Sequence, residues 1–157
     1  MGLTGVAPVR IAERQASREH GRRALARAAR ADLARARTAV AEAAEAPTAA
    51  GRYLAAHDAA LRVAAVVLAA RARPFRAERP RNAWRLLAEV APELAEWAAF
   101  FAATGGRRDA LRAGVPGHVS AADADDLLHD TERFLALVEH AVAPPGPASP
   151  RAQRDAP

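Results

Sequence analysis

Apolar residues recur every three or four positions along much of this chain, which is the period of an amphipathic α-helix. The segment 82–101 is the clearest case, and it carries both tryptophans and two of the four phenylalanines. Its apolar stripe advances in steps of 3, 4, 3 and 4 and consists of Leu87, Val90, Leu94, Trp97 and Phe101. Aromatic side chains bury the largest apolar area, so we expect the other helices to pack on this segment.

A proline divides that segment, and the sequence leaves two arrangements open. Either the helix kinks at Pro92, or one helix ends before it and a second begins with Pro92 in its first turn. Glu93 and Glu96 suit the positive end of the second helix. Gly105–Gly106 is expected to end that helix, with a short helical turn over residues 107–112 before a loop.

Residues 10–46 contain no proline and a single glycine, Gly21, and they are rich in residues that form helices well. One long helix, or two joined near Gly21, is expected. Its first half is almost entirely polar, so we predict that residues 1–24 form a basic arm exposed to solvent. The packed domain is predicted to span residues 25–142. Its first apolar face consists of Leu25, Ala29, Leu33, Ala36 and Val40.

Two further helices follow from capping residues and apolar stripes. Thr48 is expected to cap a helix that runs to about Arg73, and its dominant stripe consists of Leu54, Leu61, Ala65 and Leu68. Ser120 opens the last helix, with Asp123 in the acidic position of a capping box. The apolar face of that helix consists of Leu127, Thr131, Phe134, Leu135, Val138 and Val142. Residues 143–157 are rich in proline and predicted to be a disordered tail.

These elements predict an all-α fold, an up-and-down bundle of four to five helices with a long basic N-terminal helix and a disordered C-terminal tail. The length of 157 residues suits one domain, and alanine dominates the apolar residues, which favours closely approaching helices. The absence of cysteine excludes disulfides and thiolate metal sites. Arg62 and Arg71 interrupt the most apolar segment, and the N-terminus lacks the apolar run of a signal peptide. A cytoplasmic protein with no membrane partner is therefore expected.

All 23 basic residues are arginine, and the formal net charge is +5. This balance favours a nucleic-acid partner, since each arginine can neutralise a phosphate and release a counterion. The alternative is the codon bias of a GC-rich genome. Arginines cluster in residues 10–37 and 71–85, and Phe75 and Trp84 add aromatic rings to the second cluster, although Trp84 also suits the core. The predicted nucleic-acid-binding residues are Arg22, Arg23, Arg27, Arg30, Arg71, Arg73, Arg76, Arg79, Arg81 and Arg85.

Three segments together resemble a HEPN domain (higher eukaryotes and prokaryotes nucleotide-binding). They are RYLAAHDAALRVAAVVLAARARP, then WRLLAEVAPELAEWAAFF, which is Trp84 to Phe101, and ADDLLHDTERFLALVEHAV. The similarity covers about residues 33–142 and points to a small stand-alone actinobacterial branch. It implies an up-and-down helical bundle, often dimeric. Many members are metal-independent ribonucleases or RNA-binding modules, and their catalytic signature is an Arg followed by four to six residues and a His.

Four pairs of this chain have that spacing, and the abundance of arginine makes such pairs common by chance. The pairs are Arg14 with His20, Arg52 with His57, Arg112 with His118, and Arg133 with His140. The first lies in the basic arm, and the third spans a glycine and a proline. The members of the second point about 140° apart on one helix. We expect His57 to be a histidine at the edge of the core, bonded to a carbonyl.

Arg133 and His140 are the candidate catalytic residues, because they lie in the last helix, where the family motif is expected. They differ by about 20° in direction and by about 10 Å along the helix axis, and His129 joins their face. That face lies opposite the apolar stripe, and Phe134 follows the Arg where the family prefers a polar residue. An exposed helical surface is the alternative. A catalytic role requires a dimer that buries this face, with His140 as general base and Arg133 stabilising the phosphorane.

No other motif predicts chemistry or a cofactor. The chain has no glycine-rich phosphate loop, no HExxH and no Ser, His and Asp set. The acids near residue 123 are explained by the dipole of the last helix. Three hypotheses remain: a non-catalytic HEPN-like bundle that binds nucleic acid or nucleotide, a protein-interaction or homodimerisation module, and a HEPN endoribonuclease. Whether the chain is an enzyme stays open.

Overall fold

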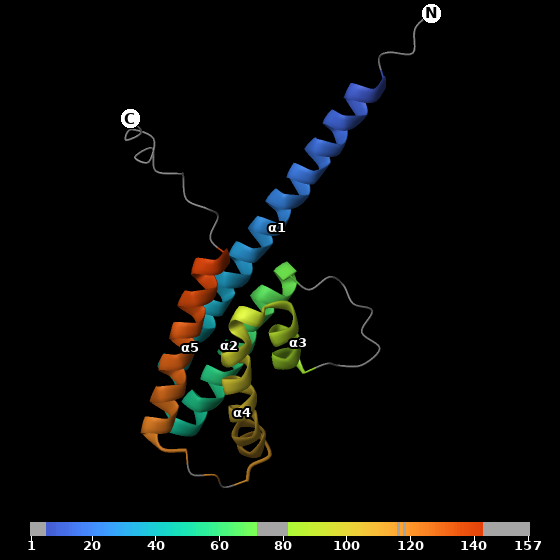
Figure 1. Ribbon diagram of the computed structural model, residues 1–157. Coiled ribbons are helices and arrows are strands. Elements are labelled where there is room, and N and C mark those ends of the chain that lie inside the picture. The colour runs from blue at the N-terminus through green and yellow to red at the C-terminus, as the bar shows by residue number, and fades with distance from the viewer. Residues whose placement is uncertain (1–5, 72–81, 116, 118, 143–157) are drawn as a thin grey trace, which may run out of the picture.

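The computed structural model describes residues 6–71, 82–115, 117 and 119–142, with side chains from residue 10 onward. Within these residues the fold is all-α, as predicted, and it is an up-and-down bundle with a long basic N-terminal helix (Figure 1). The elements are α1 (Val6–Ala44), α2 (Ala49–Arg71), α3 (Ala83–Val90), the 3₁₀ turn η1 (Pro92–Leu94), α4 (Ala95–Arg112) and α5 (Ala121–Val142). The predicted tail, residues 143–157, lies outside the described residues.

Helix α2 is the centre of the bundle. It packs most extensively against α1 and α5, while α3 and α4 pack against each other and against another side of it (Figure 1). In length and composition α2 would suffice to cross a membrane despite Arg62 and Arg71, but half of its apolar window is buried inside the bundle. A core helix of a bundle passes the same test, so its apolar composition is explained by packing.

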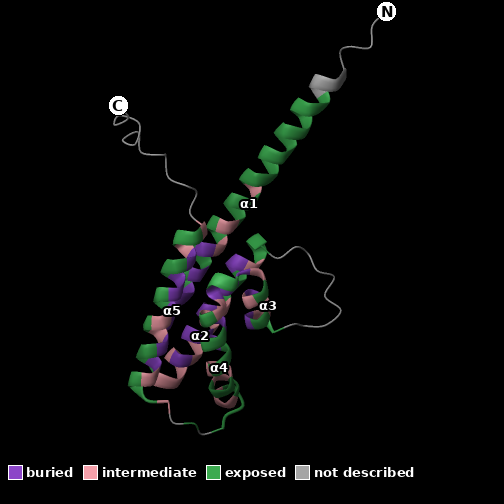
Figure 2. Cartoon of the chain, in the orientation of Figure 1, coloured by how far each residue is buried: buried purple, intermediate pink, exposed green. Residues whose placement is uncertain are grey.

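Helix α1 is continuous through Gly21, and its first half projects beyond the other helices (Figures 1 and 2). Leu33, Ala36 and Val40 are buried as predicted. Leu25 is 65% exposed, which corrects its assignment to the packed face. Leu25 lies beside the last turns of α2 and the end of α5, and the described residues there do not cover it.

The buried face of α2 differs from the predicted stripe. Leu54, Leu61 and Leu68 are only partly buried, and Ala65 is exposed. Because α2 contacts helices on several sides, its buried residues span a wide arc, and most of them are small: Tyr53, Ala56, His57, Ala59, Ala60, Val63, Ala64, Val66 and Val67. The predicted cap is confirmed, since the Thr48 hydroxyl oxygen accepts from the Gly51 amide at 3.0 Å.

The helix breaks at Pro92 rather than kinking. Ala91 leaves the helical region (φ −138°, ψ 72°), although its amide still donates to the Leu87 carbonyl at 2.8 Å. Pro92 then opens the 3₁₀ turn that leads into α4. Leu87, Leu94 and Phe101 are buried across this break. The predicted apolar stripe of segment 82–101 therefore identified residues that face the core on both sides of the break, although the segment is not one continuous helix.

The prediction that Gly105–Gly106 ends the helix is wrong. Helix α4 continues to Arg112, and Gly114, just beyond its end, has a φ of 70°. The Val115 amide donates to the Ala110 carbonyl and the Gly114 amide to the Leu111 carbonyl, at 3.0 and 3.1 Å, which is a Schellman motif. Two helical glycines cost about 1 kcal/mol each, and the ion pairs of Arg108 and Arg112, near the end of α4, with Asp58 in the middle of α2 oppose that cost.

Helix α5 begins with the predicted capping box. The Ser120 hydroxyl accepts from the Asp123 amide at 3.0 Å, and the Asp123 carboxylate accepts from the Ser120 amide at 2.9 Å. Except for Val142, which is only partly buried, the predicted apolar face is buried. From it, Phe134 reaches the ring of Phe101, 5.3 Å away between centroids. Phe101 also stacks on Trp84 at 5.0 Å, so segment 82–101 does supply the aromatic core.

Candidate nucleic-acid interface

On the bundle, most of the described arginines are neutralised by acids. The ion pairs join Arg35 to Asp32, Arg37 to Glu139, Arg52 to Asp125, Arg71 to Glu93, Arg85 to Glu89, Arg107 to Asp123, Arg108 and Arg112 to Asp58, and Arg133 to Asp130. Several of these pairs link two helices, so the arginines contribute to the fold. A guanidinium held by a carboxylate is a weak ligand for a phosphate.

The tightest of these groups lies between α2 and α4. The Nε and Nη2 atoms of Arg108 donate to one oxygen of Asp58 at 3.0 and 2.8 Å, and Arg112 donates to the other at 2.5 Å. Burial alone raises the pKa of Asp58, but the hydrogen bonds and charges of the two arginines outweigh burial, and the pKa is lowered. No sequence spacing indicated this cluster, because Asp58 lies 50 and 54 residues from Arg108 and Arg112.

The arm of α1, residues 10–30, has the opposite character. Each of its arginines is exposed, and among the described residues none of them forms an ion pair. They are Arg10, Arg14, Arg18, Arg22, Arg23, Arg27 and Arg30. Seven arginines against two glutamates give the arm a formal charge of +5, which equals the net charge of the whole chain. The rest of the chain is therefore formally neutral.

Two of these arginines, Arg18 and Arg22, follow the line of the bundle's own packing seam. Leu33, Ala36, Val40 and Ala43 face the core, and steps of three or four residues continue that line through Ala29, Leu25, Arg22 and Arg18. Successive side chains on such a line are about 5–6 Å apart along the axis. The arm thus presents two unpaired cations on the same line as the core-facing residues of α1, and the other arm arginines lie at other positions around the helix.

The second basic cluster is only partly described. Arg73, Arg76, Arg79 and Arg81 lie outside the described residues, as does Phe75. The two described members, Arg71 and Arg85, are paired with Glu93 and Glu89. Trp84 is 5% exposed and belongs to the core, so its ring is not available to stack on a base. Of the predicted binding residues, Arg22, Arg23, Arg27 and Arg30 are therefore the ones left exposed and unpaired among those described.

The candidate catalytic pair lies on the outer face of α5. Arg133 is exposed and 3.7 Å from Asp130, and His140 is exposed near the end of the helix. Within the described residues no contact joins the two, and Phe134, next to Arg133, is fully buried. His129 is exposed on the same helix, 3.7 Å from Glu132. These residues form a solvated surface, and no second element among the described residues completes a site around them.

The other Arg and His pairs form no site either. His57 is 2% exposed, and its Nε2 lies 3.0 Å from the Phe101 carbonyl, which confirms the predicted core histidine. Burial is the main cause that lowers its pKa, so the ring is neutral near pH 7. Arg52 instead contacts Asp125. His118 lies outside the described residues, and Arg14 and His20 lie in the exposed arm.

No group of three histidine, aspartate or glutamate side chains in the described residues is placed to hold a metal ion. The acids at the start of α5 have other partners. Asp123 accepts from Ser120, which lowers its pKa, and Asp125 and Asp130 pair with arginines. The dipole and these ion pairs account for them without a cation.

A sequence model of the SAV_6107-like HEPN family matches residues 41–139. The chain belongs to this HEPN family. No curated protein and no solved structure matched it. The HEPN match takes in the end of α1 and the helices α2 to α5, with the core they enclose. It does not include residues 10–30, so the unpaired arginines lie outside the part of this HEPN protein that the family model covers.

Proposed function

We propose that this HEPN protein binds single-stranded RNA or DNA through the arm of α1 and does not cut it. The observation that carries the proposal is the contrast in pairing: all described arginines of the bundle except Arg62 contact acids, whereas those of the arm are exposed and unpaired. Free guanidinium groups keep their full capacity for two hydrogen bonds to a phosphate. Membership of the HEPN family supports the same class of ligand.

Binding of this kind is driven by the release of counterions. Each arginine that neutralises a phosphate of a single strand contributes about −0.7 to the slope of log affinity against log salt concentration. Cations on an exposed helix can contact the phosphates of a flexible single strand without contacting its bases. We therefore expect affinity to fall steeply with salt and to vary little with base sequence.

Two triple variants test the proposal at equal net charge. One replaces Arg14, Arg18 and Arg22 of the arm with glutamine. The other replaces Arg35, Arg85 and Arg133, which are as exposed but ion-paired: their side chains are 66, 81 and 63% exposed. We expect the arm variant to flatten the salt slope by about 2 and the paired variant to leave it nearly unchanged. Fluorescence anisotropy with a labelled oligonucleotide measures both.

Equal losses in the two variants would show a general effect of net charge and contradict the assignment to the arm. Affinity that stays flat between low and moderate salt would contradict nucleic-acid binding itself. For the second half of the proposal, the same RNA is incubated with the protein in the absence of metal. Accumulation of shorter products would show that the bundle retains HEPN ribonuclease activity.

A further inference from the structure

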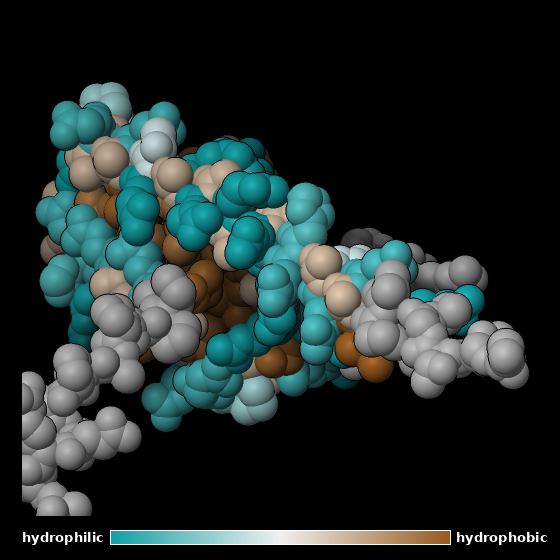
Figure 3. Space-filling model, turned by 90° about the horizontal axis from the view of Figure 1, so that it is seen from above, coloured by the Kyte–Doolittle hydropathy of each residue, from teal (hydrophilic) through white to brown (hydrophobic). Residues whose placement is uncertain are grey.

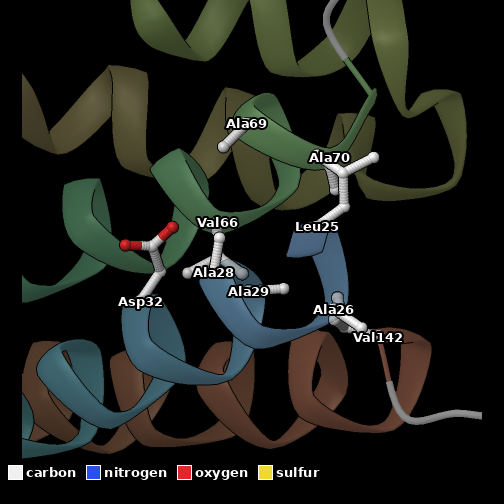
Figure 4. A pocket seen from close by; sticks show the side chains of 9 residues that line it. All are labelled: Leu25, Ala26, Ala28, Ala29, Asp32, Val66, Ala69, Ala70 and Val142. Carbon is white, nitrogen blue, oxygen red and sulfur yellow. The ribbon is translucent and has the colours of Figure 1, made fainter. Parts of the chain in front are cut away.

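Two apolar grooves lie where the arm leaves the bundle. One, of about 270 Å³, is lined by Leu25, Ala26, Ala28, Ala29, Asp32, Val66, Ala69, Ala70 and Val142 (Figure 4). The other, of about 310 Å³, is lined by Ala26, Ala29, Arg30, Leu33, Arg37, Glu139 and Val142. They share three residues, so they are adjoining parts of one surface. Seen from above, apolar surface lies open in a hollow between hydrophilic side chains (Figure 3).

This surface continues the core seam, and no other described residues cover it. Leu25 is 65% exposed although it extends the line of Leu33 and Ala36, and farther out Ile11 is 58% exposed. The nearby ends of α2 and α5 add Ala69, Ala70 and Val142, which are exposed or partly buried. A long exposed helix with no partner is only marginally stable in water. Covering this face would therefore stabilise the arm.

The residues that line the grooves limit which kind of molecule could bind there. The grooves have no aromatic ring in their lining, so they offer no platform on which a nucleobase could stack. A second copy would bring another arm with seven arginines and two glutamates, and the two arms would repel each other. Shallow grooves lined by alanine and leucine suit the small apolar side chains of a helix.

Charge decides what kind of helix fits. Arg30 lines the second groove and forms no ion pair among the described residues, whereas the other charged lining residues are paired, Asp32 with Arg35 and Arg37 with Glu139. Along the seam, Arg22 and Arg18 follow Leu25 at about 4.5 and 10 Å. An occupant that places apolar residues in the grooves therefore meets unpaired cations immediately beside them.

We propose that the grooves at the base of the arm dock an acidic amphipathic helix of another protein. Its apolar side chains pack on Leu25, Ala29 and Ala70, and its carboxylates pair with Arg18, Arg22 and Arg30. The proposal does not rest on nucleic-acid binding. Because Arg18 and Arg22 belong to the interface proposed above, the helix and a nucleic acid compete for the arm.

A designed peptide tests the docking site on the full chain. The probe is a helical peptide with leucine on one face of two turns and glutamate on the same face of the next two. The control peptide has the same composition with the leucines and glutamates on different faces. The groove variants are Ala70→Trp, which fills the groove, and Leu25→Gln, which removes its exposed leucine; both leave the net charge unchanged. Leu137→Gln, at a leucine 42% exposed on α5, is the matched control.

We expect each groove variant to lower the affinity for the amphipathic peptide by about tenfold, because burying one leucine raises the affinity of a complex by about that factor. Leu137→Gln should leave it unchanged, and the control peptide should bind more weakly than the probe. Oligonucleotide affinity should change by less than about twofold in all three variants, which separates this proposal from the one above. Circular dichroism checks folding, and if one groove variant unfolds, the other decides.

Three outcomes would overturn the proposal. Equal binding of the two peptides would show attraction by charge alone. An oligonucleotide loss as large as the peptide loss would make the grooves part of a nucleic-acid site. A dimer that sedimentation detects in the wild type and that Ala70→Trp dissociates would assign the grooves to a second copy of this chain.

Discussion

Arg108 of the bundle and Arg18 of the arm both lie on long helices rich in alanine, yet their surroundings differ in kind. The Arg108 side chain is 19% exposed and donates two hydrogen bonds to Asp58, so its charge is neutralised by an ion pair that links α4 to α2. Arg18 is exposed and has no acid within reach in the described residues. One type of side chain thus serves the fold in one region and is left free for a partner in the other. Which arginines can bind a partner therefore depends on which of them are paired with acids, and the number of arginines does not show this.

The same comparison holds for apolar residues. Most leucines and phenylalanines of the bundle are buried or partly buried, with Phe100 and Leu137 as exceptions, whereas both large apolar residues of the arm, Leu25 and Ile11, are exposed. The bundle should therefore carry almost all of the free energy of unfolding. The arm should carry almost all of the affinity for polyanions.

Phe101→Ala should have the largest effect on stability. The ring is fully buried and contacts Trp84, Trp97 and Phe134, so its removal should cost about 3–5 kcal/mol and lower the melting temperature by about 10 °C. Phe100→Ala, next to it but 37% exposed, is the control and should cost about 1 kcal/mol. Equal shifts in thermal unfolding would place the core elsewhere.

Asp58→Asn should cost about 1–2 kcal/mol, because it removes the negative charge and one of the two oxygens that accept from Arg108 and Arg112, and leaves the two cations without a counter-charge. Denaturant unfolding measures the change. Asp126→Asn, at an exposed position of α5, should change stability by less than about 0.5 kcal/mol. If the two variants matched, the ion pairs between α2 and α4 would not stabilise the bundle.

His57 should make stability depend on pH. Because burial lowers its pKa in the folded state, the unfolded chain binds a proton first as pH falls below about 6.5. This contribution is complete above that pH and is lost as pH falls toward the lowered pKa. We expect a lower denaturation midpoint at about pH 5.5 than at about pH 7.5, and a smaller difference in His57→Gln. An unchanged difference would assign the pH dependence to other groups.

Deletion of residues 1–24, which removes five of the seven arginines of the arm, should change the free energy of unfolding of the bundle by less than about 0.5 kcal/mol, since the described side chains of this segment are not buried. Hydrogen exchange should agree, with unprotected amides in the arm and slow exchange in α2. The same deletion should remove most salt-dependent binding to an oligonucleotide. A large loss of stability with unchanged binding would reverse the roles of the two regions.

Arg133→Ala and His140→Ala should have the smallest effects. Both side chains are exposed on α5, so each change should alter stability by less than about 0.5 kcal/mol and leave oligonucleotide affinity unchanged. The informative assay is RNA cleavage without metal. If cleavage is detected and either variant abolishes it, the outer face of α5 is a HEPN active site.

The sequence predicted correctly the features that depend on interactions between neighbouring residues, such as the starts of two helices. Thr48 and Ser120 begin helices because their hydroxyl oxygens accept from amides three residues on, which requires no distant partner. The Gly105–Gly106 prediction failed because α4 is held to α2 by Arg108 and Arg112, across 50 or more positions in sequence. The α2 stripe failed for a related reason: a central helix is covered on several sides, so leucine periodicity no longer marks one buried face.

By itself the sequence determined the helical class, the capped starts of α2 and α5, the aromatic core in residues 82–101 and the HEPN resemblance. Periodicity, capping and composition act over a few residues, and all of them can be read from the chain. Only the tertiary structure decided which arginines are neutralised, that Leu25 stays exposed at the base of the arm, and that Arg133 and His140 face solvent. Those properties depend on which acids and helices meet across the fold, and such contacts follow from the packing of α2 against its neighbours.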